Sequence, residues 1–195
     1  MGYRDSCDGL RDVRWGVLGA GHISHRFASS LKEVDRARLV AAAGRTPSHV
    51  EEFCRAFSID AAHGYATADD SGDAAYDALI ADPDVDAIYL ALPHGMHAHW
   101  ACRALRAGKA VLCEKPAVLN EEEAHAIASV SREYGVPFME AMKNRFCPMR
   151  TRVKDLLASG ELGRIVSIES VQKLDYGESP SGYLLDPLQG GCLYD

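Results

Sequence analysis

The sequence lacks the features of a membrane protein, a secreted protein or a nucleic-acid-binding protein. No apolar run approaches the ~20 residues that span a bilayer, and no signal peptide precedes the first predicted strand. Lysine and arginine number 21 against 28 aspartates and glutamates, which gives a formal net charge of −7. A general nucleic-acid binder needs a basic surplus to neutralise phosphates. We therefore expect a cytoplasmic protein with no membrane or nucleic-acid partner.

Paired cysteines and repeats are also missing. The six cysteines include no C-x-x-C pair, and several lie within apolar patterns, which is typical of reduced cysteine acting as a small hydrophobic residue. No internal repeat or low-complexity tract is present. Hydrophobic residues make up 47% and charged residues 25% of the 195 residues. This balance predicts a packed core in one domain, or in one domain and part of another.

What the sequence does contain is a regular alternation of short apolar strands and helices from residue 13 to about 140. Such an alternation predicts an α/β fold with a doubly wound parallel sheet, which helices cover on both faces. Ligands bind this fold at the carboxyl ends of the strands. The predicted strands are 13–18, 39–43, 85–92, 110–113 and 136–139, and the predicted helices are 22–31, 47–57, 69–80, 96–107 and 120–134, the last capped by Asn120.

The tail of the chain has a different pattern. Residues 147–159 predict a helix, residues 165–174 predict a longer strand, and residues 175–195 resemble a loop rich in glycine, proline, serine and tyrosine. One helix and one strand do not complete a domain. The prediction is therefore a doubly wound domain at 13–140, followed at 141–195 by the beginning of a second, incomplete domain.

A glycine turn follows the first predicted strand and opens the first predicted helix. It runs Gly19-Ala20-Gly21-His22-Ile23-Ser24, so serine replaces the third glycine of the dinucleotide pattern G-x-G-x-x-G. The first glycine allows a tight turn, and the second lets a pyrophosphate approach the N–H groups at the helix N-terminus. A small serine still allows close packing of helix on strand. The context favours a nucleotide site over an ordinary turn.

The end of the second predicted strand has no acidic residue. An NAD site often carries aspartate or glutamate there for the ribose hydroxyls. Here Arg45 and Thr46 follow the strand. Arginine can pair with a 2′-phosphate and stack on adenine, and threonine can donate a hydrogen bond. The stretch favours NADP, with NAD possible; the alternative is a solvent-exposed arginine at the entry of a helix.

The stretch Ala110–Leu119 places Glu114 and Lys115 at the end of an apolar strand and follows them with Pro116. Charged residues rarely enter a core unless they are paired or functional. The residues alone leave two interpretations open. One is a functional lysine held by a restricted backbone, and the other is a strand-end ion pair of Glu114 with an exposed lysine beside it.

Together these motifs resemble the glucose–fructose oxidoreductase, inositol dehydrogenase and MocA family. The matching stretches are residues 19–24, 92–97 and 108–116, and Gly190–Asp195 is similar to a family pattern G-G-x-x-x-D. Residues 138–141 and 144–148 resemble the subgroup that contains trans-1,2-dihydrobenzene-1,2-diol dehydrogenase and some NADP-dependent sugar dehydrogenases. The resemblance extends from about residue 13 to 195. It implies a Rossmann NAD(P)-binding domain and a truncated start of an α+β substrate and dimerisation domain.

The resemblance also implies an activity. A member of this family would transfer a hydride between nicotinamide and a secondary hydroxyl or carbonyl of a sugar, polyol or dihydrodiol. Full-length relatives would be homo-oligomers. The alternative is a catalytically inactive nucleotide-binding module or a truncated remnant of such an enzyme.

Roles for single residues follow from the same resemblance. Lys115 would orient the substrate hydroxyl and accept or relay its proton, and Asp195 would line the substrate pocket. A cis peptide before Pro116 is common in the family. The cofactor-binding set would comprise Gly19, Gly21, His22, Ile23, Arg45, Thr46, Pro93, His97, Glu114 and Lys115.

A metal site is not expected. His94, His97 and His99 form H-x-x-H-x-H, a spacing that invites a metal interpretation. A helix beginning near Met96 would splay these side chains, and no acidic or cysteine ligand is near them in the sequence.

Overall fold

A computed structural model describes residues 11–67 and 71–171. The chain divides into two compact units, Met1–Glu140 and Ala141–Asp195. None of the helices within the described residues is long and apolar enough to cross a membrane.

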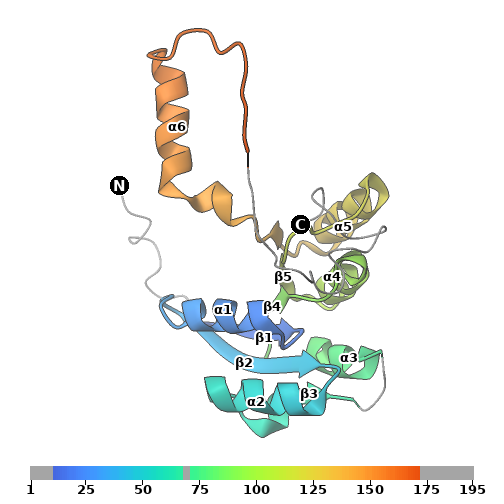
Figure 1. Ribbon diagram of the computed structural model, residues 1–195. Coiled ribbons are helices and arrows are strands. Elements are labelled where there is room, and N and C mark those ends of the chain that lie inside the picture. The colour runs from blue at the N-terminus through green and yellow to red at the C-terminus, as the bar shows by residue number, and fades with distance from the viewer. Residues whose placement is uncertain (1–10, 68–70, 172–195) are drawn as a thin grey trace, which may run out of the picture. The chain divides into compact units, whose positions relative to one another are not determined.

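The first unit is built on a parallel sheet of six strands (Figure 1). The order β3-β2-β1-β4-β5-β6 reverses direction between β1 and β4. That reversal is the point at which doubly wound sheets bind ligands. The predicted fold class is thus confirmed. The strands are β1 (Val13–Leu18), β2 (Ala37–Gly44), β3 (Gly64–Ala66), β4 (Ala87–Leu90), β5 (Ala110–Cys113) and β6 (Phe138–Glu140).

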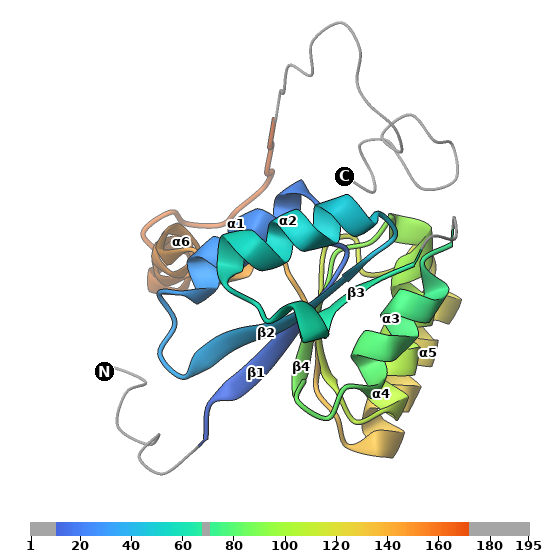
Figure 2. The same ribbon diagram turned by 90° about the horizontal axis from the view of Figure 1, so that it is seen from below.

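Helices cover both faces of this sheet (Figure 2). Helices α1 (His22–Leu31) and α2 (Pro47–Phe57) pack on one face over a core that includes Val17 and Phe53. The other face carries a larger core, with Leu79 and Trp100 fully buried. Its helices are α3 (Asp73–Ala81), α4 (His97–Arg106) and α5 (Glu121–Tyr134).

Local sequence signals explain where α5 begins and ends. The Asn120 side chain accepts a hydrogen bond from Glu123 N at 2.9 Å, and the Glu123 carboxylate accepts one from Leu119 N at 2.8 Å. This reciprocal pair satisfies N–H groups that a helix start leaves open. Gly135 ends the helix in the left-handed conformation, at φ +64°. The predicted cap is confirmed.

Several predicted elements differ from the structure, and among them β2 and β6 have other bounds than the predicted 39–43 and 136–139. The short edge strand β3 and the 3-10 turn Ala61–His63 before it were not predicted. Helix α3 begins at Asp73 rather than at residue 69, because Gly72 precedes it at φ +77°, outside the helical region. Strand β4 is shorter than predicted, and a 3-10 turn, His94–Met96, separates it from α4.

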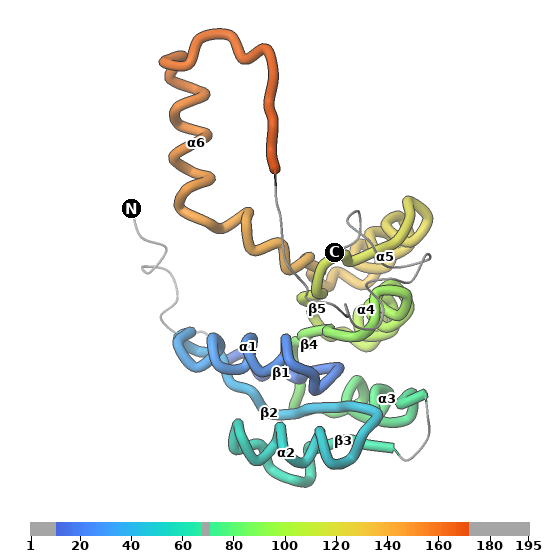
Figure 3. The backbone as a smooth tube through the Cα atoms, in the orientation of Figure 1, coloured from blue at the N-terminus to red at the C-terminus, as the bar shows by residue number. Residues whose placement is uncertain are grey.

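The second unit contains a 3-10 turn, Lys143–Phe146, and helix α6 (Pro148–Ser159). Residues 165–171 follow as an irregular segment, whose path Figure 3 traces from the end of α6. The strand predicted at 165–174 is therefore wrong over 165–171, and residues 172–174 lie outside the described residues. A strand needs a hydrogen-bonded neighbour. Ile168 is 85% exposed here.

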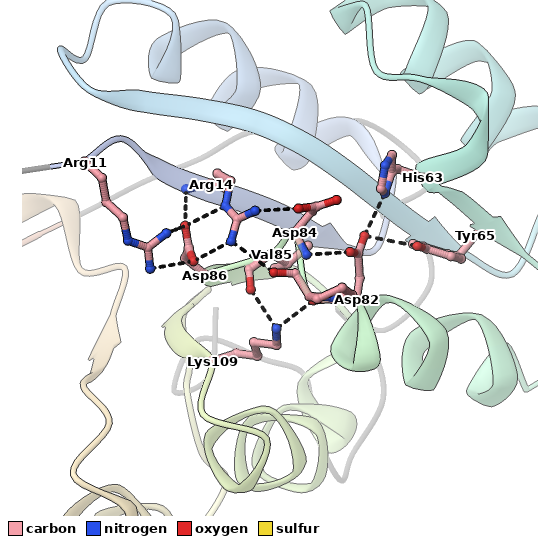
Figure 4. A network of polar contacts seen from close by, with 10 residues as sticks. Arg11, Arg14, His63, Tyr65, Asp82, Asp84, Val85, Asp86 and Lys109 are labelled. Carbon is pink, nitrogen blue, oxygen red and sulfur yellow. Dashed lines mark hydrogen bonds and ion pairs between the residues drawn. The ribbon is translucent and has the colours of Figure 1, made fainter.

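A polar network ties together the amino-terminal ends of β1 and β4 (Figure 4). The Asp86 carboxylate accepts hydrogen bonds from Arg14 N and Arg14 Nε, both at 3.0 Å, and from the Arg11 guanidinium. Nearby, Asp82 accepts from His63 at 2.8 Å and from Tyr65 at 3.0 Å. The network thus lies at the amino-terminal ends of β1 and β4 and extends to β3 through His63 and Tyr65.

The same network contains a group that could hold a metal ion. Ligand atoms of His63, Asp82 and Asp84 lie within 4.8 Å of one another. Arg14 pairs with Asp84 at 2.6 Å, and the Lys109 ammonium donates to the Asp82 carbonyl at 2.7 Å. Because Arg14 already pairs with the Asp84 carboxylate, and the Asp82 carboxylate already accepts from His63 and Tyr65, we interpret the group as a network of ion pairs and hydrogen bonds.

Replacing Asp86 should test how much this network stabilises the domain. Hydrogen bonds from Arg14, more than any other cause, hold the pKa of Asp86 well below its usual range. The stabilisation is therefore present above the unfolded-state pKa of about 4 and is lost as pH falls toward the folded-state value. Asp86→Asn should cost about 2 kcal/mol at pH 7, as measured by urea denaturation.

Measuring the same stability difference at acidic pH checks this interpretation. The difference between wild type and Asp86→Asn should shrink at pH 3. Asp77→Asn serves as the control, because Asp77 pairs with Arg103 at the surface, where both side chains are more than 40% exposed. Its cost should stay below about 1 kcal/mol. An Asp86→Asn cost that is independent of pH would contradict the ion-pair account.

Candidate functional site

The glycine turn between β1 and α1 is held by its own backbone and by Ser24. Gly19 has φ +98°, and its N–H donates to the Ala43 carbonyl at 2.9 Å. The Gly19 carbonyl accepts from Gly21 N at 2.9 Å and from the Ser24 hydroxyl at 2.5 Å. Ser24 is fully buried. The serine therefore packs closely, as predicted, and also closes the turn with a hydrogen bond that the sequence pattern did not indicate.

The two glycines of this turn differ in how much space surrounds them. A Cβ on Gly19 would lie 2.4 Å from the Ala91 carbonyl oxygen, whereas a Cβ on Gly21 would meet nothing within 4 Å. The protein's own packing therefore requires glycine at 19 but not at 21. The space at Gly21 adjoins the first turn of α1, where His22 is exposed and Ile23 half-buried. Such a helix start, with open N–H groups, suits a phosphate.

A cavity of about 180 Å³ opens beside this turn. It lies where the strand order reverses, and residues from the ends of β1, β2 and β4 line it. The cavity brings together a set of predicted cofactor residues from three separate loops: Gly19, Gly21, Arg45, Thr46 and Pro93. His49 and Tyr76 also line it and were not predicted. A signal for His49 was available, since it stands in the first turn of the helix after β2.

The β2–α2 junction presents the polar groups of this cavity. Thr46 caps α2 with its carbonyl, which accepts from His49 N and Val50 N, both at 3.1 Å, while its side chain makes no capping bond. Arg45 is exposed. Its stem passes Gly72, where an added Cβ would lie 2.5 Å from Arg45 Cγ. The junction therefore offers a cation and a hydroxyl to an anionic ligand.

The end of β5 holds Glu114 and Lys115 by different means. Glu114 N donates to the Leu90 carbonyl at 2.8 Å and continues the pairing of β5 with β4. The Glu114 carboxylate accepts from the Tyr89 hydroxyl and from Lys115 N at 3.2 Å. The carboxylate thus accepts from a phenol and from a backbone N–H. Lys115 is half-buried, and its peptide bond to Pro116 is cis, as the resemblance implied.

Tyr89 was not predicted as part of this site. Its ring stacks on Phe27 of α1, with centroids 3.9 Å apart and planes within 4°. Burial, with a further effect of the bond to Glu114, raises the pKa of Tyr89, so the phenol stays protonated and donates to the carboxylate. Nothing in the local sequence marks this contact, because 25 residues separate the two side chains.

His97, predicted to bind the cofactor, is not among the residues that line the cavity. It is fully buried, and its ring nitrogens lie 2.7 Å from the Leu92 and Pro116 carbonyl oxygens. Both ring nitrogens therefore contact backbone, in the loops that follow β4 and β5. His94 is also buried, and the two rings are 5.7 Å apart. His99 is exposed, so the three histidines do not converge.

Two further side chains complete the account. Cys113, next to Glu114, is fully buried, and burial raises the pKa of its thiol, which therefore stays neutral inside the strand. Asp195, predicted to line a substrate pocket, lies outside the described residues.

Comparisons with known proteins agree with this geometry. The chain is 36% identical over 168 residues to trans-1,2-dihydrobenzene-1,2-diol dehydrogenase from Bos taurus, covering 84% of this chain and 47% of the relative. It is 32% identical over 184 residues to D-xylose 1-dehydrogenase (NADP(+)) 2 from Haloferax volcanii, covering 94% and 53%. The chain spans about half the length of the curated relatives it matches.

A solved structure gives the same result. The fold is similar to a 3-ketoreductase from Actinomadura kijaniata in complex with NADP, with TM-score 0.68 and 33% identity over 78% of this chain and 46% of that one. The model of an oxidoreductase family with an NAD-binding Rossmann fold matches residues 13–142. The chain belongs to this family, which is named after glucose–fructose oxidoreductase, inositol dehydrogenase and MocA.

Proposed function

We propose that this chain supplies the NADP-binding half of an oxidoreductase that acts on a secondary hydroxyl or carbonyl of a sugar, polyol or dihydrodiol. The observation that carries the proposal is the cavity at the strand-order reversal, where the glycine turn and Arg45 meet. Relatives at more than 30% identity are named as dihydrodiol and NADP-dependent xylose dehydrogenases. The site therefore supports the cofactor, and the names of the relatives support the cofactor and the reaction.

The two phosphate groups of the cofactor each have a proposed place in the site. The pyrophosphate would bind the N–H groups at the start of α1, where His22 and Ile23 lie and Gly21 leaves open space. The 2′-phosphate would bind Arg45 and Thr46. NAD would lack the group that pairs with Arg45, so we propose NADP as the preferred cofactor.

Lys115 is the proposed catalytic residue. When bound, NADP would accept or supply the hydride. Lys115 would orient the substrate hydroxyl and accept its proton. The bonds from Tyr89 and Lys115 N hold Glu114 at the strand end beside it. In this proposal residues 13–140 form the cofactor domain, and residues 141–195 begin the substrate domain, with Asp195 in its pocket.

Turnover tests this function directly. Because the chain spans about half the length of its relatives, the wild type should reduce NADP only weakly, with at least one member of a panel of sugars, polyols and dihydrodiols. Lys115→Ala should lower the rate at saturating NADP at least tenfold, because general acid–base groups commonly contribute about 10²–10⁴-fold. Lys32→Ala, an exposed lysine at the end of α1, is the control. Full activity of Lys115→Ala would overturn the catalytic assignment.

The same assay distinguishes the oxidoreductase from the alternative, a nucleotide-binding module without catalysis. Binding of NADPH by the wild type, with no turnover of any compound in the panel, would support a nucleotide-binding module without catalysis. A cytoplasmic location, the absence of membrane and nucleic-acid partners, and oligomer formation by full-length relatives stay predictions.

A further inference from the structure

One buried histidine contacts both the loop after β4, which lines the cofactor cavity, and the loop after β5, which carries Lys115. His97 stands at the start of α4, with no exposed surface. Its Nε2 lies 2.7 Å from the Leu92 carbonyl oxygen, in the loop after β4. Its Nδ1 lies 2.7 Å from the Pro116 carbonyl oxygen, in the loop after β5. A single ring thus spans two loops that are 24 residues apart in sequence.

The chemistry of these contacts depends on the protonation state of the ring. Carbonyl oxygens only accept hydrogen bonds, and a neutral imidazole donates from one nitrogen, so the second contact becomes a hydrogen bond only when the ring is protonated. Burial lowers the pKa of His97, while the two carbonyls, and more weakly Glu114, act in the opposite direction and His94 acts with burial. A leucine or phenylalanine would fill the volume at less desolvation cost. The two carbonyl contacts therefore explain why a polar ring occupies this buried position.

The two backbone segments that His97 contacts lie next to the cofactor cavity and next to Lys115. Leu92 and Pro93, at one end of the bridge, line the cofactor cavity. Pro116, at the other end, follows Lys115 directly. A change in the bridge would therefore alter the separation between the cavity wall and the lysine.

We propose that His97 is a positioning residue, which sets Lys115 against the nicotinamide half of the cofactor by bridging the Leu92 and Pro116 carbonyls. The inference rests on the proposed function, since it assumes that NADP binds in the cavity. It assigns no contact between His97 and the cofactor. The adenosine half would bind Arg45 and the glycine turn, to which His97 makes no hydrogen bond.

Two probes separate a positioning role from a structural one. NADPH carries both halves of the cofactor, whereas adenosine 2′,5′-bisphosphate carries only the adenosine half. His97→Phe keeps a ring but no donor, and should weaken NADPH binding about tenfold, equivalent to one lost buried hydrogen bond. Binding of adenosine 2′,5′-bisphosphate should change less than about twofold. His97→Gln, which keeps a donor for one carbonyl, should recover part of the NADPH affinity.

The control is His99→Phe, the same substitution at an exposed position on the same helix, which should leave both dissociation constants unchanged. If His97→Phe does not fold, His97→Gln against wild type carries the comparison, with a smaller loss confined to NADPH. Equal weakening of both probes, or no change for NADPH, would overturn the positioning role and leave cofactor binding standing. A wild type that binds neither probe would overturn the proposed function and this inference with it.

Discussion

Gly19→Ala is expected to cost more than about 4 kcal/mol of folding free energy, a large share of the roughly 5–15 kcal/mol that stabilises a typical domain. The glycine has φ +98°, and its added Cβ would lie 2.4 Å from the Ala91 carbonyl oxygen. That oxygen cannot retreat cheaply, because Ala91 N is bonded to the Leu18 carbonyl at 2.9 Å and fixes β4 to β1. Thermal and urea unfolding followed by circular dichroism would measure the loss.

Gly21→Ala is the matched control for that variant, two residues along the same turn. Its Cβ would meet no protein atom within 4 Å, and its φ is not positive. The melting temperature should therefore stay within a few degrees of wild type. NADPH binding should weaken at least tenfold, because the methyl group would occupy space that the pyrophosphate needs. Equal destabilisation by both variants, or unchanged NADPH binding by Gly21→Ala, would contradict this division of roles.

Arg45→Ala is expected to remove the preference for NADPH over NADH. A charge-assisted bond to the 2′-phosphate accounts for about 10–100-fold in affinity, which only NADPH gains. Titration with each cofactor, followed by nicotinamide fluorescence, should show NADPH binding falling by that factor while NADH binding barely changes.

The control for Arg45 is Arg38→Ala, an exposed arginine near the opposite end of β2. It should alter neither titration, apart from a small long-range charge effect that added salt removes. A wild type that binds NADH more tightly than NADPH would show that the interpretation of Arg45 is wrong, although the fold would stand.

Features encoded within a few residues were predictable from the sequence. The apolar strands, the helix cap at Asn120 and the glycine turn each depend on neighbours in the chain, and the structure shows all three. The end of β2 lacks an acid, and that local fact was enough to direct attention to Arg45. The structure then places Arg45 in the same cavity as the turn.

Features that depend on distant partners were not predictable. Strand β3 has three residues and forms only because β2 offers an edge. The contacts of His97 with the Pro116 carbonyl, of Tyr89 with Glu114, and of Arg14 with Asp86 join groups 19 to 72 residues apart. The strand predicted at 165–174 does not form over 165–171, where no neighbouring strand among the described residues pairs with it. Its β propensity is real, but propensity alone does not supply a neighbouring strand.

The sheet keeps its salt-bridge network and its ligand cavity at opposite ends of β1 and β4. This separation matters to a protein engineer. Substitutions around Arg14 and Asp86 can be screened for heat tolerance with little risk to coenzyme choice, and the loops around Arg45 can be diversified without eroding the clamp that keeps the strands together. The two properties can therefore be optimised in separate libraries and combined afterwards, since sites this far apart usually contribute additively.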